Sequence, residues 1–490
     1  MTRPVADTVL LINPPPCSPI GLLCTNIVQL PPMGLAYLAA AVRQHGFDPY
    51  IFDMRSPQND KARFVEEFKR LKPKVVGFSI MTDFVNNSIR LARIIKSIDP
   101  ECWVVFGGPH PGYRAHESLN TGVVDVVAVK GDGEAVFVEI CKKASTNDAS
   151  SLQDVQGIVF KDGDGIVQTP RPPVTKDLDQ IHWPAWDLLQ LEDYNVALIH
   201  TSRGCVGSCK FCCEGVGVEN RPRKRSIDHV REELKYIYDL GIRNISFSDD
   251  NFVSGKKRLA SICEMVMEEF PGLSWSCETR SDTTDLDCIR LMADAGCRSM
   301  HFGVESIFPE THKQQKKRVR LEDLNEKVAL AQELGVMTFL TFVMGLPNET
   351  EEQIRASFAY AMEMEQKYKA SPAFGILTPY PGSDYGEHPE KYGITIESTN
   401  YDLYNTLTPV ISTPHLSRRE LQSLQCDLVM ESLKNTTRKQ HDRHGLFDRG
   451  LLDEHGRITV LQARGSAPPN LSDKISLKRT STAPSSAPSV

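Results

Sequence analysis

The sequence predicts two successive α/β units, a doubly wound parallel sheet followed by a second series of strand–helix repeats. Short apolar strands alternate with amphipathic helices over residues 7–145, and the alternation resumes at residue 196. Glycine-rich and polar turns follow these strands, and in parallel sheets such turns gather at the carboxyl edge, where ligands bind. At 490 residues the chain is long enough for more than one domain.

The first unit is expected to occupy residues 1–145. Gly46 ends its first helix, and no G-x-G-x-x-G sequence opens a helix after the first strand, which counts against a dinucleotide site. Strands are expected at 9–12, 50–53, 75–80, 103–106 and 123–129, and helices at 33–45, 63–71 and 87–97.

Residues 146–195 are expected to connect the two units. Apolar runs at 157–160 and 166–169 flank Asp-Gly-Asp-Gly, which predicts a hairpin. Two tryptophans, Trp183 and Trp186, lie beside a proline and are expected to form a packed strap between the units.

The second unit is expected to occupy residues 196–395, with Ser226 capping its first helix. Its six repeats are too few for a closed eight-stranded barrel. Strands are expected at 196–201, 244–248, 273–277, 299–303, 337–343 and 374–377, and further helices at 257–269, 287–295 and 324–334.

A small, mostly helical cap is expected at residues 396–463, with one helix at 417–435. Residues 464–490 are rich in Ser, Pro and Thr without apolar periodicity, and we expect them to be disordered.

Composition narrows the function classes. The net charge of −7 counts against a chain-wide nucleic-acid surface. No apolar run reaches the roughly 18 residues of a membrane span, and the first residues do not resemble a secretory signal. The cysteines are not spaced as a disulfide framework, so the cytoplasm is the expected compartment.

The most informative stretch is residues 201–217, TSRGCVGSCKFCCEGVG. Cys205, Cys209 and Cys212 have the spacing C-x3-C-x2-C, with Phe211 before the third cysteine. Three thiolates on one loop can bind three irons of a [4Fe–4S] cluster and leave the fourth iron open to another molecule. Glycines at 204, 207 and 215 allow the backbone to bend around the cluster.

Two other interpretations of the three cysteines remain open. A zinc loop is one, although no second pair of ligands at zinc-finger spacing lies nearby. A chance triplet is the other, since the chain has 13 cysteines. Cys213 follows directly after Cys212, and we expect it to be a spare thiol rather than a ligand.

The cysteine spacing, with its aromatic residue, resembles the signature of the radical S-adenosylmethionine (SAM) enzymes. A Rossmann-like domain with PPMGLAYLAA at 31–40 and GGPH at 107–110, placed before such a core, resembles the cobalamin-binding radical SAM family. The resemblance covers about residues 8–410. It implies a cobalamin (B12)-binding first domain and a partial (β/α)6 radical SAM barrel with a [4Fe–4S] cluster.

Candidate cobalamin-binding residues lie at the carboxyl ends of the first set of strands. No D-x-H-x-x-G sequence follows any strand, so we expect cobalamin without a protein histidine on cobalt, His110 being the nearest exception. The candidates are Asn13, Pro14, Met33, Gly34, Ser79, Thr82, Gly107, Gly108, Pro109, His110, Gly131 and Glu134.

Candidate SAM-binding residues lie at the carboxyl ends of the second set of strands. Carboxylates suit the amine and ribose hydroxyls of SAM, and an arginine suits its carboxylate. Gly345, in the family-like GLPNET, would allow adenine to approach. The same acidic residues would also suit helix caps. The candidates are Phe211, Asp249, Asp250, Arg280, Glu305 and Gly345, and no acid–base residue can be named.

The resemblance implies a C-methyltransferase that acts on an unactivated carbon of a small molecule through a 5′-deoxyadenosyl radical and methylcobalamin. An electron donor such as flavodoxin or ferredoxin would be a partner. A radical cyclase or rearrangement enzyme without methyl transfer is the first alternative, and a non-catalytic iron–sulfur and corrinoid sensor is a weaker one. Methylthiolation of tRNA is disfavoured by the acidity of the chain.

Overall fold

We describe a computed structural model of the chain, which places residues 7–18, 29–129, 131–146, 149–213 and 222–435. Three sequence-based expectations lie outside these residues: the glycine at 215, the part of the helical cap beyond 435, and the disordered tail at 464–490.

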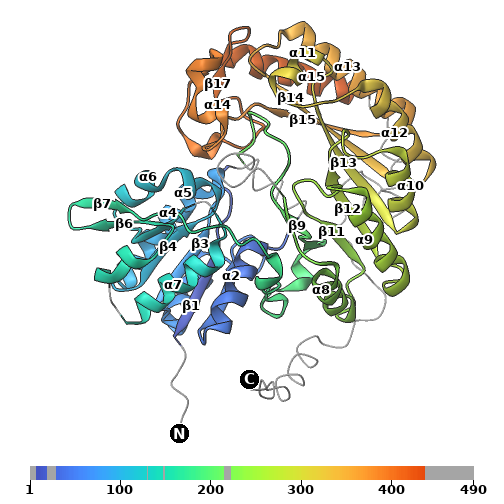
Figure 1. Ribbon diagram of the computed structural model, residues 1–490. Helices are drawn as coiled ribbons and strands as arrows, with labels where there is room; N and C mark the ends of the chain where they lie inside the picture. The colour runs from blue at the N-terminus through green and yellow to red at the C-terminus, as the bar shows by residue number, and fades with distance from the viewer. Residues whose placement is uncertain (1–6, 19–28, 130, 147–148, 214–221, 436–490) are drawn as a thin grey trace. The chain divides into compact units, whose positions relative to one another are not determined.

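The first unit is built on a seven-stranded sheet with the order β2-β1-β3-β4-β5-β6-β7 (Figure 1). The first five of these strands are parallel, which confirms the doubly wound prediction. The strands are β1 (Thr8–Asn13), β2 (Asp48–Asp53), β3 (Val75–Ser79), β4 (Trp103–Gly107), β5 (Val126–Ala128), β6 (Ile158–Asp162) and β7 (Gly165–Gln168).

Helices cover both faces of this sheet. Leu35 and Phe137, from α2 and α7, belong to one hydrophobic core, whereas Phe64 and Ile95, from α3 and α4, belong to the other. Strand order reverses at β1, so the carboxyl ends of β1 and β3 border the crevice in which open α/β sheets bind ligands. The helices are α2 (Met33–Gln44), α3 (Lys61–Leu71), α4 (Val85–Ile98), α5 (Pro109–Tyr113), α6 (Ala115–Asn120) and α7 (Gly133–Ser145).

The predicted hairpin forms, but it does more than connect the two units. Strand β6 pairs antiparallel with β5, and β7 pairs antiparallel with β6. The first sheet therefore continues past residue 145 and takes in the first part of the predicted connection. Local pattern predicts a hairpin turn, whereas the choice of a partner strand depends on contacts distant in the sequence.

The second unit contains a six-stranded sheet with the order β15-β14-β13-β12-β11-β8. Every neighbouring pair is parallel, which confirms the six predicted repeats. Strands β8 and β15 are its two edges, so the sheet is a partial barrel. The strands are β8 (Ala197–Ile199), β11 (Asn244–Phe247), β12 (Ser274–Thr279), β13 (Cys297–Glu305), β14 (Met337–Met344) and β15 (Ser371–Ile376).

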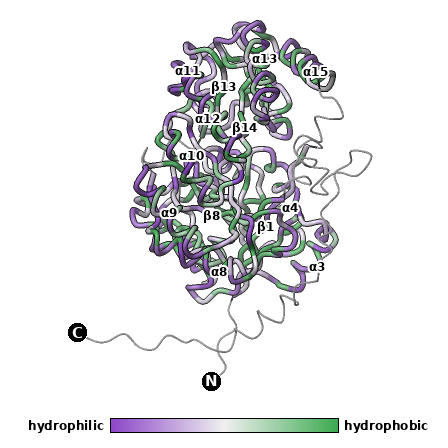
Figure 2. Tube along the Cα trace, turned by 90° about the vertical axis from the view of Figure 1, so that its right-hand side faces the viewer, coloured by the Kyte–Doolittle hydropathy of each residue, from purple (hydrophilic) through white to green (hydrophobic). Residues whose placement is uncertain are grey.

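Amphipathic helices pack on this sheet. In Figure 2, hydrophobic and hydrophilic residues alternate along α9 and α10, as expected of helices buried on one face. Ser226 caps α8, because its hydroxyl accepts a hydrogen bond from the His229 amide at 3.0 Å. The helices are α8 (Ile227–Asp239), α9 (Lys256–Glu269), α10 (Leu286–Asp294), α11 (Pro309–Gln314), α12 (Leu321–Glu333) and α13 (Glu351–Tyr368).

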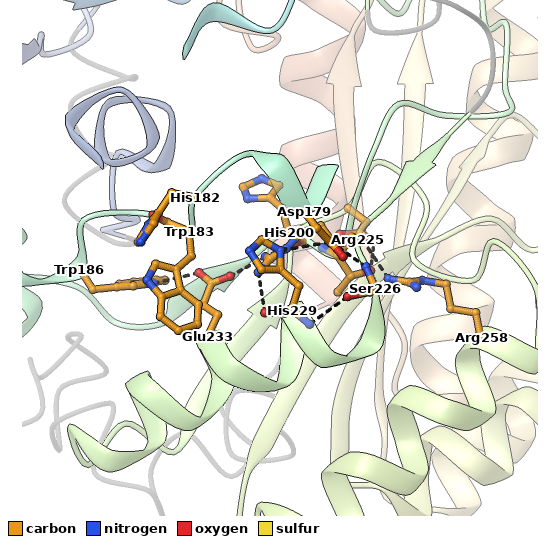
Figure 3. Close-up of polar contacts among 12 residues, drawn as sticks. Asp179, His182, Trp183, Trp186, His200, Arg225, Ser226, His229, Glu233 and Arg258 are labelled. Carbon is orange, nitrogen blue, oxygen red and sulfur yellow. Dashed lines mark hydrogen bonds and ion pairs between the residues drawn. The ribbon is translucent and has the colours of Figure 1, made fainter. Parts of the chain in front are cut away.

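The two tryptophans of the connection form the predicted strap (Figure 3). Trp186 is 1% exposed, and its indole donates to Glu233 Oε1 at 2.9 Å. Arg225 Nη1 donates to the other oxygen of Glu233 at 2.5 Å, and this ion pair is buried. Trp183 stacks on His229, which lies in α8 as Glu233 does. The connection is therefore fixed to α8 by a buried polar network.

The described end of the chain packs beside β14 and β15. The predicted helix at 417–435 is present as α15, and its Leu421, Leu424 and Leu428 are buried. The described helices include none that is long and apolar enough to cross a membrane. The helices and strands in this part of the chain are α14 (Asp384–Glu387), β16 (Thr395–Ile396), β17 (Ile411–Ser412) and α15 (Arg418–Asn435).

Candidate active site

The loop that carries the three cysteines begins just after β8 and the short strand β9 (Ser202–Arg203). A β-carbon at Gly207 would lie 3.4 Å from Cys205 Sγ and 3.7 Å from Cys209 Sγ. The Cys212 amide donates to the Cys209 carbonyl at 3.1 Å. All three cysteines are partly exposed. The loop is therefore tight enough to bring Cys205 and Cys209 around one point.

The zinc interpretation gains no support. Within the residues that the structure describes, no group of three or more His, Cys, Asp or Glu side chains is arranged to bind one metal ion. An iron–sulfur cluster does not require the three cysteines to meet at one ion, because each cysteine binds a separate iron. The assignment of Cys205, Cys209 and Cys212 to a cluster stays a prediction.

Asp249, at the end of β11, fastens the start of this loop. Its carboxylate accepts hydrogen bonds from Thr201 N and Thr201 Oγ1, both at 2.6 Å, and from Ser202 Oγ at 2.7 Å. Burial raises the pKa of Asp249, and the hydrogen bonds from Thr201 and Ser202 oppose that rise. The next residue, Asp250, accepts from the Gly204 amide at 3.0 Å. Both carboxylates thus fix the backbone that leads to Cys205.

Two cations lie beside Cys209. Arg280 follows β12, is held by Asp282 through bonds of 2.8 and 2.7 Å, and places Nη1 at 4.0 Å from Cys209 Sγ. Burial raises the pKa of the Cys209 thiol, whereas Lys317 and Arg280 oppose this rise. Positive charge at this position would favour the thiolate once iron displaces the proton.

Glu305 ends β13 in an unusual conformation. Its φ of +66° is in the left-handed region, which costs free energy in a non-glycine residue. Its carboxylate forms a buried ion pair with Lys317. A β-carbon at Gly303 would lie 2.5 Å from both Glu305 Oε1 and Lys317 Nζ, so a larger residue there would displace the ion pair. Strained backbone that holds a buried charge is typical of ligand sites.

A cavity of about 390 Å³ lies between the carboxyl edge of the first sheet and the start of the cysteine loop. One end is apolar, between the sheet and helices α2 and α7, and includes Leu38, Val105 and Phe137. The other end is polar and includes Arg203 and Asp250. Cys205 also lines the cavity, so a group bound there would be next to the cysteine loop.

Several glycines line the cavity near the carboxyl edge of the first sheet. Gly108 has φ +96°, and a β-carbon there would lie 2.6 Å from Ile80 N. No larger residue fits at this position without moving the backbone. Gly34, Gly107 and Gly131 line the same side. Such a surface allows a large ligand to approach the strand ends closely.

His200 faces the cavity from the end of β8. Its Nδ1 is buried and has no hydrogen-bond partner. Burial lowers the pKa of His200 to about 4, and Arg203 and Arg225 contribute to the shift. The ring is therefore neutral at pH 7 and packs edge-on to Tyr37.

The comparisons with known proteins identify both units. Residues 27–140 match the B12 binding domain, and residues 199–361 match the radical SAM superfamily. The first match falls on the first sheet, and the second begins at the end of β8 and includes the cysteine loop. The chain is a cobalamin-binding radical SAM enzyme.

The similarity to known proteins extends over most of the enzyme. The uncharacterized methyltransferase PH0819 of Pyrococcus horikoshii is 29% identical over 463 residues, which is 93% of this chain and 97% of the relative. An anaerobic magnesium-protoporphyrin IX monomethyl ester cyclase of Cereibacter sphaeroides is 24% identical over 433 residues, 85% of this chain and 68% of the cyclase.

A solved structure has the same fold. The methyltransferase TsrM of Kitasatospora setae, with cobalamin and a [4Fe–4S] cluster bound, superposes with a TM-score of 0.66 at 19% identity, over 93% of this chain and 83% of TsrM. At this identity the likeness establishes the fold and leaves the substrate open.

The cofactors of the enzyme are a [4Fe–4S] cluster, SAM and cobalamin, as its two domains imply. The residues present fit these groups. Soft thiols and adjacent cations suit an iron–sulfur cluster. The cavity, which glycines, apolar residues and charged residues line together, suits a ligand that has both apolar and hydrogen-bonding parts.

The structure divides the predicted cobalamin-binding residues into two groups. Met33 is buried in the hydrophobic core of the second unit, and Asn13 donates to Asp53 Oδ1 at 2.8 Å between β1 and β2. His110 packs edge-on against Tyr401. These residues, with Pro14 and Thr82, do not line the cavity. Those that do line it are Gly34, Ser79, Gly107, Gly108, Pro109, Gly131 and Glu134.

The predicted SAM-binding residues have varied surroundings. Arg280 and Glu305 lie by the cysteine loop, and their role with SAM stays a prediction. Phe211 packs against the core beside α15, and Asp249 uses its oxygens on the loop. A β-carbon at Gly345 would lie 2.9 Å from Leu421 Cδ2, and the role of Gly345 beside adenine stays a prediction.

Sequence reasoning missed four residues that the fold brings to these sites. Lys317 is separated from Glu305 by α11, and His200 precedes the cysteine motif without being part of it. Arg203 and Asp132 meet across the two units. Only Asp132 had a usable signal, since it lies inside the Gly131–Glu134 turn that the strand pattern predicts.

Proposed function

We propose that the enzyme is a C-methyltransferase that methylates an unactivated carbon of a small molecule. The observation that carries this proposal is the shared cavity, which glycines of the B12 binding domain line together with Cys205 of the radical SAM domain. A corrinoid at the sheet edge and a cluster on the loop would then face the same substrate. The names of several relatives, including PH0819, support methyl transfer.

When bound, the cluster and SAM supply a carbon-centred radical, and the corrinoid supplies a methyl group. Cys205, Cys209 and Cys212 would hold the cluster. Arg280, which Asp282 orients, would bind the carboxylate of SAM and offset the negative charge of the thiolates. The protein's contribution is to orient the reactants and to exclude water.

Glu305 and Lys317 would complete the SAM site. In the structure the two side chains neutralise each other in a buried position. The zwitterionic amino-acid part of SAM offers each of them a partner of opposite charge, so its binding would replace one buried pair by two. Gly303 leaves the space in which this exchange can occur.

The cavity would hold cobalamin. Its apolar end suits an aromatic base, and its polar end suits the amide groups around a corrin ring. We keep the prediction that no protein histidine binds cobalt, and His110, which packs against Tyr401, does not line the cavity.

The partners that follow from this proposal are a small-molecule substrate and a one-electron donor such as flavodoxin or ferredoxin. The donor is needed because SAM is cleaved only by the reduced cluster. An oxygen-sensitive cluster suits the reducing cytoplasm, which remains the expected compartment.

A radical cyclase is the second candidate. It is favoured by similarity to the cyclase of Cereibacter sphaeroides, which covers 85% of this chain. Both candidates use the same cofactors, and they differ in whether the methyl group of SAM reaches the product.

The test is anaerobic reconstitution of the full chain with iron, sulfide and hydroxocobalamin, followed by turnover with methyl-labelled SAM, a reductant and metabolite extracts. Methyl transfer predicts 5′-deoxyadenosine together with label in a new product. 5′-Deoxyadenosine with an unlabelled new product would favour the cyclase. Cofactor binding without any cleavage of SAM would overturn both and favour the sensor.

A further inference from the structure

The two ends of the cysteine loop are joined by a short antiparallel pair, which we call the neck. It consists of β9, which leads into the loop, and β10 (Arg223–Lys224), which follows it. Arg203 and Arg223 lie directly opposite each other in this pair. Like charges in opposite positions of two strands repel each other. The neck therefore needs negative charge from elsewhere in the molecule.

That charge comes from the turn between β5 and α7 of the B12 binding domain. Asp132 Oδ1 accepts from Arg203 Nη1 at 3.0 Å, and Asp132 Oδ2 accepts from Arg223 Nη1 at 2.5 Å. Glu134 Oε1 accepts from Arg203 Nη2 at 2.5 Å. We call these four residues the neck ion cluster. The neck ion cluster joins β9 and β10 of the radical SAM domain to the start of α7 in the B12 binding domain.

The opposite charges of the neck ion cluster stabilise one another. Arg203 forms ion pairs with both acidic residues, with Asp132 Oδ1 at 3.0 Å and with Glu134 Oε1 at 2.5 Å. Burial opposes the low pKa of Asp132, which the hydrogen bond from Arg223 nevertheless maintains. The side chains of Asp132 and Arg223 are 10% and 12% exposed, so solvent screens their pair only weakly.

The same turn lines the cavity. Gly131, Asp132 and Glu134 are among its lining residues, and so are Arg203 and Arg223. A ligand in the cavity would therefore contact both sides of the neck ion cluster and favour the arrangement in which the turn holds the neck closed.

We propose that the neck ion cluster couples the two metal sites, so that corrinoid binding and iron–sulfur cluster assembly strengthen each other. This inference rests on the proposed cobalamin site and adds a relation between the cofactors. Corrinoid fixes the turn, the turn holds Arg203 and Arg223 together, and the closed neck holds the cysteine loop in a bent conformation. Such coupling is reciprocal, because it is a free energy shared by both sites.

The coupling is measured on the wild-type chain without turnover. Hydroxocobalamin binding is followed by equilibrium dialysis, with cobalt counted by mass spectrometry, for the protein with and without its reconstituted cluster. We expect the dissociation constant to fall about 10-fold when the cluster is present, within the usual range of coupling between sites. We expect cobalamin to slow the removal of iron by a chelator correspondingly.

Variants separate the neck from direct contact between the cofactors. Asp132→Asn removes the charge that bridges the two arginines, and Glu134→Gln provides a second variant. We expect the ratio of the two dissociation constants to approach 1 in both. Asp187→Asn is the matched control, since Asp187 pairs with Arg43 at 2.9 Å away from the neck and should retain the wild-type ratio.

Equal hydroxocobalamin affinity of wild-type protein with and without the cluster would overturn the coupling and leave the proposed function standing. A full wild-type ratio in Asp132→Asn and Glu134→Gln would overturn the role of the neck. Failure of the wild-type protein to bind hydroxocobalamin at all would overturn the proposed function and the coupling together.

Discussion

Removing the carboxylate of Glu233 should destabilise the protein more than any change to an exposed charge. Glu233 is fully buried on α8, where it accepts from the Trp186 indole and pairs with Arg225 (Figure 3). Glu233→Ala would leave the guanidinium of Arg225, whose side chain is 5% exposed, without its counter-charge.

The expected magnitude follows from the two lost interactions. Breaking a buried ion pair by removing one partner costs about 3–5 kcal/mol. Leaving the buried indole N–H of Trp186 without an acceptor costs about 1–3 kcal/mol. The two costs share one carboxylate and overlap, so we expect a loss of about 4 kcal/mol in the free energy of unfolding. That is a large part of the 5–15 kcal/mol typical of a folded protein.

Urea unfolding followed by tryptophan fluorescence measures this loss, because Trp186 is itself part of the network. Glu232→Ala is the matched control, since Glu232 is the exposed neighbour on the same helix and should change stability by less than about 0.5 kcal/mol. Replacing both partners, Arg225→Met with Glu233→Leu, should recover most of the loss. A loss below about 1.5 kcal/mol in Glu233→Ala would refute the reasoning.

Three further predictions concern the sites. Cys205→Ala should lose cluster iron on reconstitution whereas Cys213→Ala should retain it; equal iron in both variants would contradict the ligand assignment. Lys317→Met should lower the free energy of unfolding, measured in urea, by about 3–5 kcal/mol, because Glu305 keeps a buried charge without its partner. Adding Glu305→Gln to this variant should recover part of the lost stability. A urea unfolding midpoint that Lys317→Met leaves unchanged would contradict the prediction. Burial, with a nearby arginine, lowers the pKa of His110 from 6.5 to about 4. Between pH 6.5 and 4, His110 is protonated in the unfolded chain and neutral in the folded chain. The free energy of unfolding should therefore fall by up to about 3 kcal/mol as the pH drops from 6.5 to 4. His110→Gln should flatten this slope in unfolding measured across that range, and an unchanged slope would argue against the burial effect.

The strands and their order along the chain could be predicted because each is a short apolar run with a clear turn signal. The capping box that begins α13, Thr350 with Gln353, was an equally clear signal that the expectations did not use. Which strands pair with each other could not be predicted in this way. Nothing in residues 158–168 indicates that this hairpin joins β5, because the pairing depends on a strand about 30 residues earlier in the sequence.

The sites show the same division between local and distant information. Spacing alone predicts the cysteine loop, and the glycine turns at the carboxyl edge predict Gly107, Gly108 and Gly131. Met33 illustrates the limit, since it follows the same kind of turn but begins α2 and points into the core of the other unit. Which side chain faces a cavity depends on helix rotation and packing, which a single sequence does not specify.

Partners across the two units were out of reach for the same reason. Arg203 and Asp132 are 71 residues apart, and Lys317 reaches Cys209 from the far end of α11. No local pattern distinguishes Arg203 and Lys317 from ordinary surface charges. Their importance follows only from burial and from the opposite charges that the fold brings to them.

The central claim is that corrinoid and iron–sulfur cluster occupy adjacent sites around one cavity. The most direct measurement is pulsed electron paramagnetic resonance on protein loaded with both, in the cob(II)alamin and reduced-cluster states. The account predicts that each centre speeds the spin relaxation of the other. Relaxation of cob(II)alamin that is unchanged by the reduced cluster would contradict it.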